Sequence, residues 1–167
     1  MCSMPETKIQ MPADFYDQTP DGNVLATEAV MNTIRTADLL FGRIGRLLRP
    51  LGVSAAGGLV AGMLRDRGPM TPSELGERLI VTRATVTGVV DSLERRGYVS
   101  RRPIESDRRS VMIELTDAGV RVVQTLRELV HHHEREWMAV LSDDELRGYI
   151  GDLQRIQDAL AEAQPDA

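Results

Sequence analysis

Apolar residues recur at helical spacing along most of the chain. Between Val24 and Pro50 they follow one another in steps of three or four residues, which places them on one side of a helix. These positions are Val30, Ile34, Ala37, Phe41, Ile44 and Leu48. Ser54 can cap a second helix over residues 55–66, which is rich in glycine. The pattern therefore predicts a long amphipathic helix followed by a shorter one with small side chains.

Two further helices are expected, with a tight turn between them. Thr71-Pro72-Ser73-Glu74 joins a cap residue, a proline at the first helical position and the glutamate of a capping box. Thr82 can cap the next helix, whose inward positions run from Val86 to Leu93 and which Gly97 ends. Two short helices joined in this way are typical of a helix-turn-helix.

A change of period marks the next segment. Residues 98–102 and 110–115 alternate as strands do, and the polar, arginine-rich residues 103–109 between them predict a hairpin tip. Beyond the hairpin, Thr116 can cap a long helix that continues to Leu141.

A second capping box, Ser142-Asp143-Asp144-Glu145, opens the last predicted helix, with an apolar stripe from Leu146 to Leu160. The fold class that these elements predict is mainly α with a small β-hairpin.

Composition limits the class of protein. The 167 residues suit one domain, and 42% apolar with 4% aromatic residues predicts an aliphatic core. Residues 1–22 lack a sustained period and carry three prolines, so we expect a mobile arm and no signal peptide. Residues 51–64, the longest weakly charged run, are too few to span a bilayer, and the single cysteine permits no internal disulfide. These features predict a soluble cytoplasmic protein with no membrane partner.

Charge is segregated along the chain. The formal net charge is −5, yet residues 78–109 hold eight arginines against four acids, a local charge of +4 that leaves −9 for the remainder. An acidic chain with one basic segment is typical of a protein that docks one face on a polyanion.

A helix-turn-helix followed by a hairpin, the wing, makes a winged helix-turn-helix, whose second helix fits the major groove of DNA. Arginine can bond guanine with two hydrogen bonds, and threonine offers a hydroxyl and a methyl group. The outward face of this helix is formed by Arg83, Ala84, Thr87, Gly88 and Asp91, with Thr85 at its edge. The residues expected to read bases are Thr82, Arg83, Thr85, Thr87 and Gly88. The residues expected to contact the DNA backbone are Thr71, Ser73, Arg78, Arg95 and Arg96.

Residues 71–119 resemble the multiple-antibiotic-resistance regulator (MarR) family. The matching stretches are TPSELGERLIVTRATVTGVVDSLERRGYVSR, Asp107-Arg108-Arg109 and Leu115-Thr116-Asp117-Ala118-Gly119, and the flanking helices extend the match over residues 24–163. The chain departs from the family at Gly88, where the recognition helix often carries a larger polar or basic residue.

This resemblance implies a winged helix-turn-helix lobe on a helical dimerisation platform. The function it implies is that of a dimeric DNA-binding transcriptional regulator, a repressor released from a pseudo-palindromic operator by a small lipophilic or phenolic effector. The expected divisions are an arm over 1–22, one domain over 23–163 with dimerisation helices at 23–50 and 116–163 and the DNA-binding lobe at 54–115, and a tail over 164–167.

The resemblance also assigns roles by position. Residues 82–91 become the base-reading helix, and Asp107 would hold Arg109 by an ion pair at the wing. Arg108 or Arg109 could enter a minor groove, where negative potential is concentrated, and Arg109 is the better candidate. In the alternative interpretation the Asp107–Arg109 pair only stiffens the turn.

The run of three histidines and the single cysteine could suggest a metal site or a sensing thiol, but structural roles explain both more simply. Consecutive residues of His131-His132-His133 point about 100° apart on a helix. His132 or His133 with Glu136 would give zinc two ligands, where a structural site takes four, so we expect no metal. His133 is interpreted as an interface or core residue, and Cys2, with no base beside it, as an inert part of the arm.

Two hypotheses of different class remain. The first is the DNA-binding regulator, and the second is a winged-helix protein-interaction module without specific DNA binding. The chain has no glycine-rich phosphate loop and no nucleophile elbow, so we expect neither an enzyme nor a cofactor. The arginines of residues 78–109 favour the regulator.

Overall fold

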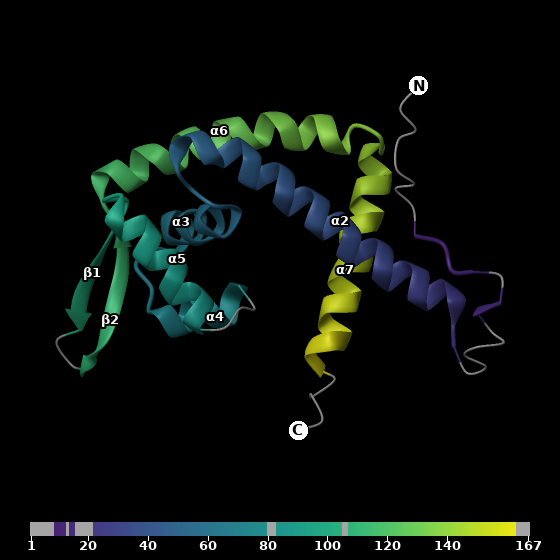
Figure 1. Cartoon of the computed structure of the whole chain (residues 1–167), viewed down its shortest axis with the longest axis horizontal. Helices are drawn as coiled ribbons and strands as arrows, with labels where there is room; N and C mark the ends of the chain where they lie inside the picture. The colour runs from purple at the N-terminus through teal and green to yellow at the C-terminus, as the bar shows by residue number, and fades with distance from the viewer. Residues whose placement is uncertain (1–8, 13, 16–21, 80–82, 105–106, 163–167) are drawn as a thin grey trace. The chain divides into compact units, whose positions relative to one another are not determined.

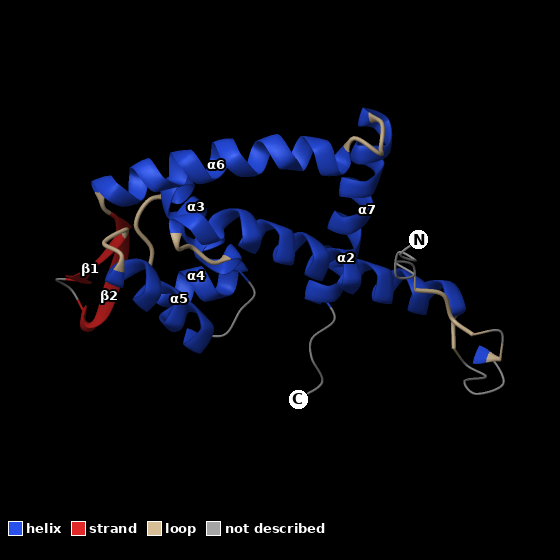
Figure 2. Ribbon diagram, turned by 45° about the horizontal axis from the view of Figure 1, so that its top comes forward, coloured by secondary structure: helices blue, strands red, loops and turns tan. Residues whose placement is uncertain are grey.

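The computed structural model describes residues 9–12, 14–15, 22–79, 83–104 and 107–162. Figure 1 labels the helices and strands along the chain, and Figure 2 separates helix from strand by colour. The chain divides into two compact units, residues 1–123 and 124–167. It is mainly helical with one antiparallel hairpin, as the hydrophobic pattern predicted.

The first unit opens with a long helix and a short one. Helix α2 (Val24–Leu48) is followed by a 3-10 turn, η1 (Arg49–Leu51), and by α3 (Ala55–Arg67). The backbone N–H of Gly57 donates to Ser54 Oγ over 3.0 Å, which confirms Ser54 as the cap of α3.

The helix-turn-helix follows. Helix α4 (Pro72–Leu79) begins at the predicted capping box, and α5 (Arg83–Arg95) ends before Gly97, whose φ of 72° confirms the predicted left-handed terminator. Thr82, the expected cap of α5, lies outside the described residues.

Strands β1 (Val99–Ile104) and β2 (Asp107–Leu115) form the wing. The predicted loop over residues 103–109 is wrong in its length, because Pro103, Ile104 and residues 107–109 belong to the strands. A two-stranded ribbon can be solvated on both faces, so polar side chains do not stop the backbone from continuing its pairing. Met70 adds a single antiparallel bridge to Ile113, with N···O distances of 2.8 and 3.0 Å.

Helix α6 (Asp117–Met138) begins in the first unit and continues into the second, which α7 (Asp143–Glu162) completes. The backbone N–H of Ser142 donates to Glu145 Oε2 over 2.8 Å, which confirms the second capping box. Leu141 was expected on the stripe of the long helix but follows its end, where its N–H closes a turn on the carbonyl of Met138.

The core of the first unit is aliphatic, as the composition predicted. No polar or charged side chain is buried among the described residues. The largest side chains of this unit that are almost fully buried are Leu48, Val60, Leu75, Val86, Val90, Leu93, Val99, Ile113 and Val123. They come from α2, α3, α4, α5, both strands and α6, so the wing and the recognition helix share one core.

Part of the expected arm contacts α2. Ile9 donates its N–H to Asn32 Oδ1 and accepts from Asn32 Nδ2, at 3.2 and 2.9 Å, and the N–H of Met11 donates to Glu28 Oε1 over 2.8 Å. Mobility of the arm as a whole stays a prediction.

Among the described residues, no single helix has both the length and the apolar character of a membrane span. The segments Val24–Leu51 and Ala55–Arg67, bent by 78° where they join, meet both requirements only as a pair.

Candidate nucleic-acid interface

The outward face of α5 carries the central residues of the expected reading surface. Thr85, Thr87 and Gly88 are exposed, while Val86 and Val90 on the opposite side are almost fully buried. A Cβ added to Gly88 would meet no atom within 4 Å, so this position is open. The side chain of Arg83, at the first residue of α5, lies outside the described part of the structure. Three of the five residues expected to read bases, Thr85, Thr87 and Gly88, are therefore accessible from solvent.

An ion-pair cluster joins the recognition helix to the wing. Arg101 on β1 pairs through Nη2 with Asp91 Oδ1, and through Nη1 with Glu94 Oε2 at 2.6 Å. Asp91 was expected on the outward face of α5, and in the structure its carboxylate is bound to Arg101.

Sequence reasoning missed this cluster, although a signal was present. Asp91 and Glu94 are three residues apart and therefore share one side of a helix. An arginine in the strand that follows is a natural partner for two such acids.

Helix α4 and its cap residue hold three of the expected DNA-backbone contacts, with Thr71 and Ser73 at its start and Arg78 in its last turn. The Thr71 hydroxyl donates to Glu74 Oε2 over 2.9 Å and accepts from the N–H of Glu74 at 3.2 Å. The Thr71 N–H, which donates to Glu74 Oε2 over 2.7 Å, and the Thr71 hydroxyl, which donates to the same oxygen, lower the pKa of the Glu74 carboxyl. The hydroxyl of Thr71 is thus occupied by the cap, whereas Ser73 and Arg78 are exposed.

The two arginines at the end of α5 differ in their surroundings. Arg95 is exposed in the last turn. The guanidinium of Arg96 lies against the backbone of Gly52, where an added Cβ would come within 2.0 Å of Nη1. Gly52 also has a φ of 69°, and this positive φ favours glycine here. The Arg96 guanidinium thus lies beside Gly52, and of the pair Arg95 is the more available for a phosphate.

The base of the wing is fixed to α6. The Thr116 N–H donates to the carbonyl of Tyr98 over 3.1 Å, and its hydroxyl donates to the carbonyl of Gly97 over 2.6 Å. The same hydroxyl accepts from the N–H of Gly119 at 3.0 Å and caps α6, as predicted. Tyr98 also donates its phenol hydroxyl to the carbonyl of Leu51 over 3.2 Å.

At the far end of the wing, Asp107, Arg108 and Arg109 lie in β2 rather than in a loop. Their side chains are outside the described part of the structure, so the expected Asp107–Arg109 ion pair stays a prediction.

The histidines of α6 are accounted for by contacts within the helix. His132 Nε2 and His133 Nδ1 both contact the Glu136 carboxylate, at 3.5 and 3.0 Å, where one or the other was expected. His133 also stacks on Trp137 with ring centroids 5.9 Å apart. It is half-buried in the single chain, so it is not a fully buried core residue, and its interpretation as an interface residue stays a prediction. Cys2 lies outside the described residues, and among those described no group of three or more candidate ligands could hold a metal ion.

Comparisons with known proteins agree with this geometry. The MarR family profile matches residues 62–111. The transcriptional regulator PecS of Dickeya dadantii is 32% identical over 133 residues, which cover 75% of this chain and 80% of PecS. The transcriptional repressor YetL of Bacillus subtilis is 50% identical over 50 residues, 30% of each chain.

Among solved structures, a cysteine-to-serine mutant of MarR from E. coli in complex with operator DNA aligns with a TM-score of 0.66 and 27% identity. The alignment covers 77% of this chain and 95% of that one. The chain belongs to the MarR family of winged helix-turn-helix transcriptional regulators, which are not enzymes.

Proposed function

We propose that the chain is a homodimer that binds a pseudo-palindromic DNA operator through α5 and the wing, and that a small-molecule effector releases it. The observation that carries this proposal is the exposed face of α5, with Thr85, Thr87 and Gly88 outward and Arg101 joining the helix to the wing. A helix of 13 residues is about 20 Å long, which suits a major groove.

The relatives support the finer points of this proposal without testing them in this chain. One solved relative is bound to operator DNA, and YetL is named a repressor. On this basis we assign repression. Release by a small lipophilic or phenolic effector and action in the cytoplasm are proposed from the family resemblance. Thr82 and Arg83 join the base-reading set, and Asp107, Arg108 and Arg109 form the wing contact.

Selection of bound sequences from a random duplex pool tests the DNA-binding function. Two copies of α5 related by a two-fold axis face successive major grooves, which recur every 34–36 Å or so on one side of B-DNA. We therefore expect a pseudo-palindrome with half-sites about ten base pairs apart. If no sequence is enriched, and if the affinity for random duplex DNA does not depend on salt concentration, the protein-interaction module is favoured instead.

Arg83→Ala and Arg95→Ala should weaken DNA binding in different ways. Arg83 stands where the helix tip enters the groove, so its loss should cost about 1–3 kcal/mol on the operator and relax preference at one position per half-site. Loss of Arg95 should weaken all sequences alike and lower the salt slope by about one unit. Binding curves on operator and scrambled DNA at several salt concentrations separate the two, and identical behaviour would remove Arg83 from the reading face.

The apolar stripe of α2 supports the homodimer. Val30, Ile34 and Phe41 are 58%, 59% and 47% exposed in the single chain. In the second unit, α7 has no buried residue and leaves Ile150, Ile156 and Leu160 exposed. Apolar patches of this kind mark interaction surfaces. The proposed divisions are arm 1–22, domain 23–163, dimerisation helices 23–50 and 116–163, DNA-binding lobe 54–115 and tail 164–167.

Ile34→Glu should dissociate the dimer. We expect an obligate interface of more than about 2,000 Å² in total, and a carboxylate buried in it has no partner. Sedimentation at micromolar concentration should show a dimer for the wild type and a smaller or unfolded species for the variant. Thr36→Glu, at an exposed position off the stripe, is the control and should remain dimeric. A stable wild-type monomer would contradict the proposal.

A further inference from the structure

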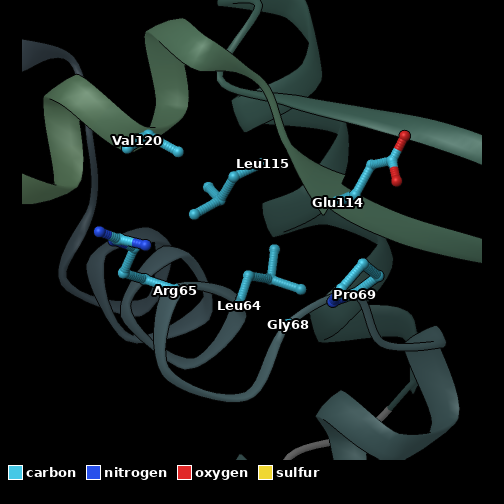
Figure 3. A pocket seen from close by; sticks show the side chains of 7 residues that line it. All are labelled: Leu64, Arg65, Gly68, Pro69, Glu114, Leu115 and Val120. Atoms are coloured by element: carbon cyan, nitrogen blue, oxygen red, sulfur yellow. The ribbon is translucent and has the colours of Figure 1, made fainter.

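The exposed face of α5 carries only small side chains in its first two turns after Arg83. The exposed residues between 84 and 88 are Ala84, Thr85, Thr87 and Gly88, and none of them is larger than threonine. These four residues form the small face of the helix. The groove in Figure 3 is lined by residues of α3, β2 and α6 and of the loop after α3, and by none of α5, so the small face stands apart from it.

The long side chains that distinguish bases by hydrogen bonds are missing from this part of α5. Arginine and lysine bond guanine, and asparagine and glutamine bond adenine, but residues 84–94 contain none of these four types. Acidic side chains can accept from cytosine, yet the carboxylates of Asp91 and Glu94 are bound to Arg101. A threonine hydroxyl both donates and accepts, so it discriminates poorly between bases. The selective contact that remains is that of alanine and threonine methyl groups with the methyl group of thymine.

Gly88 allows the helix to approach the bases closely. A glycine inside a helix lowers its stability relative to alanine, and here the rest of the described chain does not require one. The backbone is helical, and an added Cβ would meet no atom within 4 Å. A partner outside the chain explains the glycine, because a missing side chain lets the backbone come near base edges. The small face rises about 6 Å along the helix axis, which matches about two base-pair steps of roughly 3.4 Å.

We propose that the small face reads about two adjacent A·T base pairs in each half-site, with thymine methyl groups against the methyls of Ala84 and Thr87 and the base edges close to Gly88. This inference rests on the proposed function, in which α5 enters a major groove. It adds the chemical group that is recognised, which is a methyl group and not a hydrogen-bonding edge. Uracil has the hydrogen-bonding edge of thymine without the methyl group, so the protein should bind a uracil-containing operator more weakly.

Deoxyuridine substitution in the DNA tests the role of the methyl group. The probe is the duplex that selection from a random pool enriches most, with deoxyuridine in place of thymidine in both half-sites, titrated with the full-length protein. Loss of one buried methyl contact should weaken binding about threefold, and loss of the two contacts related by symmetry about tenfold. Deoxyuridine at thymidines outside both half-sites is the control and should leave the affinity unchanged.

Two substitutions at Thr87 separate its methyl group from its hydroxyl. Thr87→Ser keeps the hydroxyl, and it should weaken binding to the thymidine duplex about tenfold and be less sensitive than the wild type to deoxyuridine. Thr87→Val keeps the methyl group and the shape, and it should bind both duplexes as the wild type does. Equal affinities for the two variants, whether both are weakened or neither is, would overturn the assignment of the methyl group.

Gly88→Leu tests the close approach of the backbone. The position is exposed and open in the free chain, so the thermal midpoint should stay level or rise. Binding to the enriched duplex should weaken at least about tenfold, because the side chain would stand between the helix and the base edges. Binding to a scrambled duplex at low salt should be kept, since it depends on phosphate contacts. Wild-type affinity of this variant for the enriched duplex would show that α5 does not approach the bases at Gly88.

The outcomes distinguish this inference from the proposed function. If no sequence is enriched, the proposed function is overturned and the inference with it. If a sequence is enriched and its affinity is unchanged by deoxyuridine throughout both half-sites, the inference alone is overturned and the DNA-binding regulator stands. Enriched half-sites that lack two adjacent A·T pairs would have the same consequence.

Discussion

Gly119→Ala should destabilise the protein by about 2–4 kcal/mol. A Cβ at Gly119 would stand 1.9 Å from the carbonyl oxygen of Tyr98 and 3.0 Å from Cδ2 of Leu115. The carbonyl belongs to the backbone and cannot rotate away as a side chain could. Moving it disturbs the bond that it accepts from the Thr116 N–H. Greater helix propensity of alanine, worth about 1 kcal/mol, offsets only part of this cost.

Thermal unfolding followed by circular dichroism measures the effect. We expect the midpoint to fall by roughly 10 °C, with variants compared at one protein concentration because the proposed dimer couples stability to concentration. Gly88→Ala is the matched control: it lies in a helix, its added Cβ meets no atom within 4 Å, and its midpoint should stay level or rise. A Gly119→Ala midpoint equal to that of the wild type would show that α6 does not approach Tyr98 as closely as the structure has it.

Features decided within one helical turn could be predicted from the sequence. The caps at Ser54 and Thr116 and the capping boxes that begin at Thr71 and Ser142 are each made by residues three apart, so their spacing alone identifies them. The inward positions of α5 followed in the same way from period, because one face of an amphipathic helix has to be buried.

Features that depend on distant partners could not be predicted. The contact of Arg96 with Gly52 and the bond from Tyr98 to the carbonyl of Leu51 join residues more than forty positions apart. No local pattern reports such pairs. The length of the wing was missed for a related reason, since pairing between strands, and not the polarity of residues 107–109, decides where β2 begins.

The outward face of α5 combines a feature that the sequence predicts with one that it does not. Period placed Thr85, Thr87 and Gly88 on the outside of α5 correctly. The same reasoning placed Asp91 among them, because on a bare helix it has nothing else to contact. Arg101 supplies that contact, and it comes from β1, whose position relative to α5 depends on the tertiary fold.

Arg101→Gln should lower operator affinity about tenfold, or ~1.4 kcal/mol, with little loss of stability. Arg101 is 31% exposed and its two partners somewhat more, so the ion pairs contribute modestly to folding. Their larger role is to fix β1 against α5, so that wing and recognition helix reach DNA in a set orientation. Loss of the guanidinium also leaves Asp91 and Glu94 unpaired, and both carboxylates would repel the phosphates.

Arg102→Gln is a close control because it removes the same charge one residue away. Arg102 is 62% exposed, and its guanidinium forms an ion pair with Glu114 at 3.6 Å. Both variants should lose about one unit of salt slope, whereas the additional loss at fixed salt should appear for Arg101 alone. In a background that carries Asp91→Asn and Glu94→Gln, the ion-pair cluster is already lost. There, Arg101→Gln should lower operator affinity no more than Arg102→Gln does. Equal losses for the two arginines in the wild-type background would show that Arg101 contributes charge and does not position the wing.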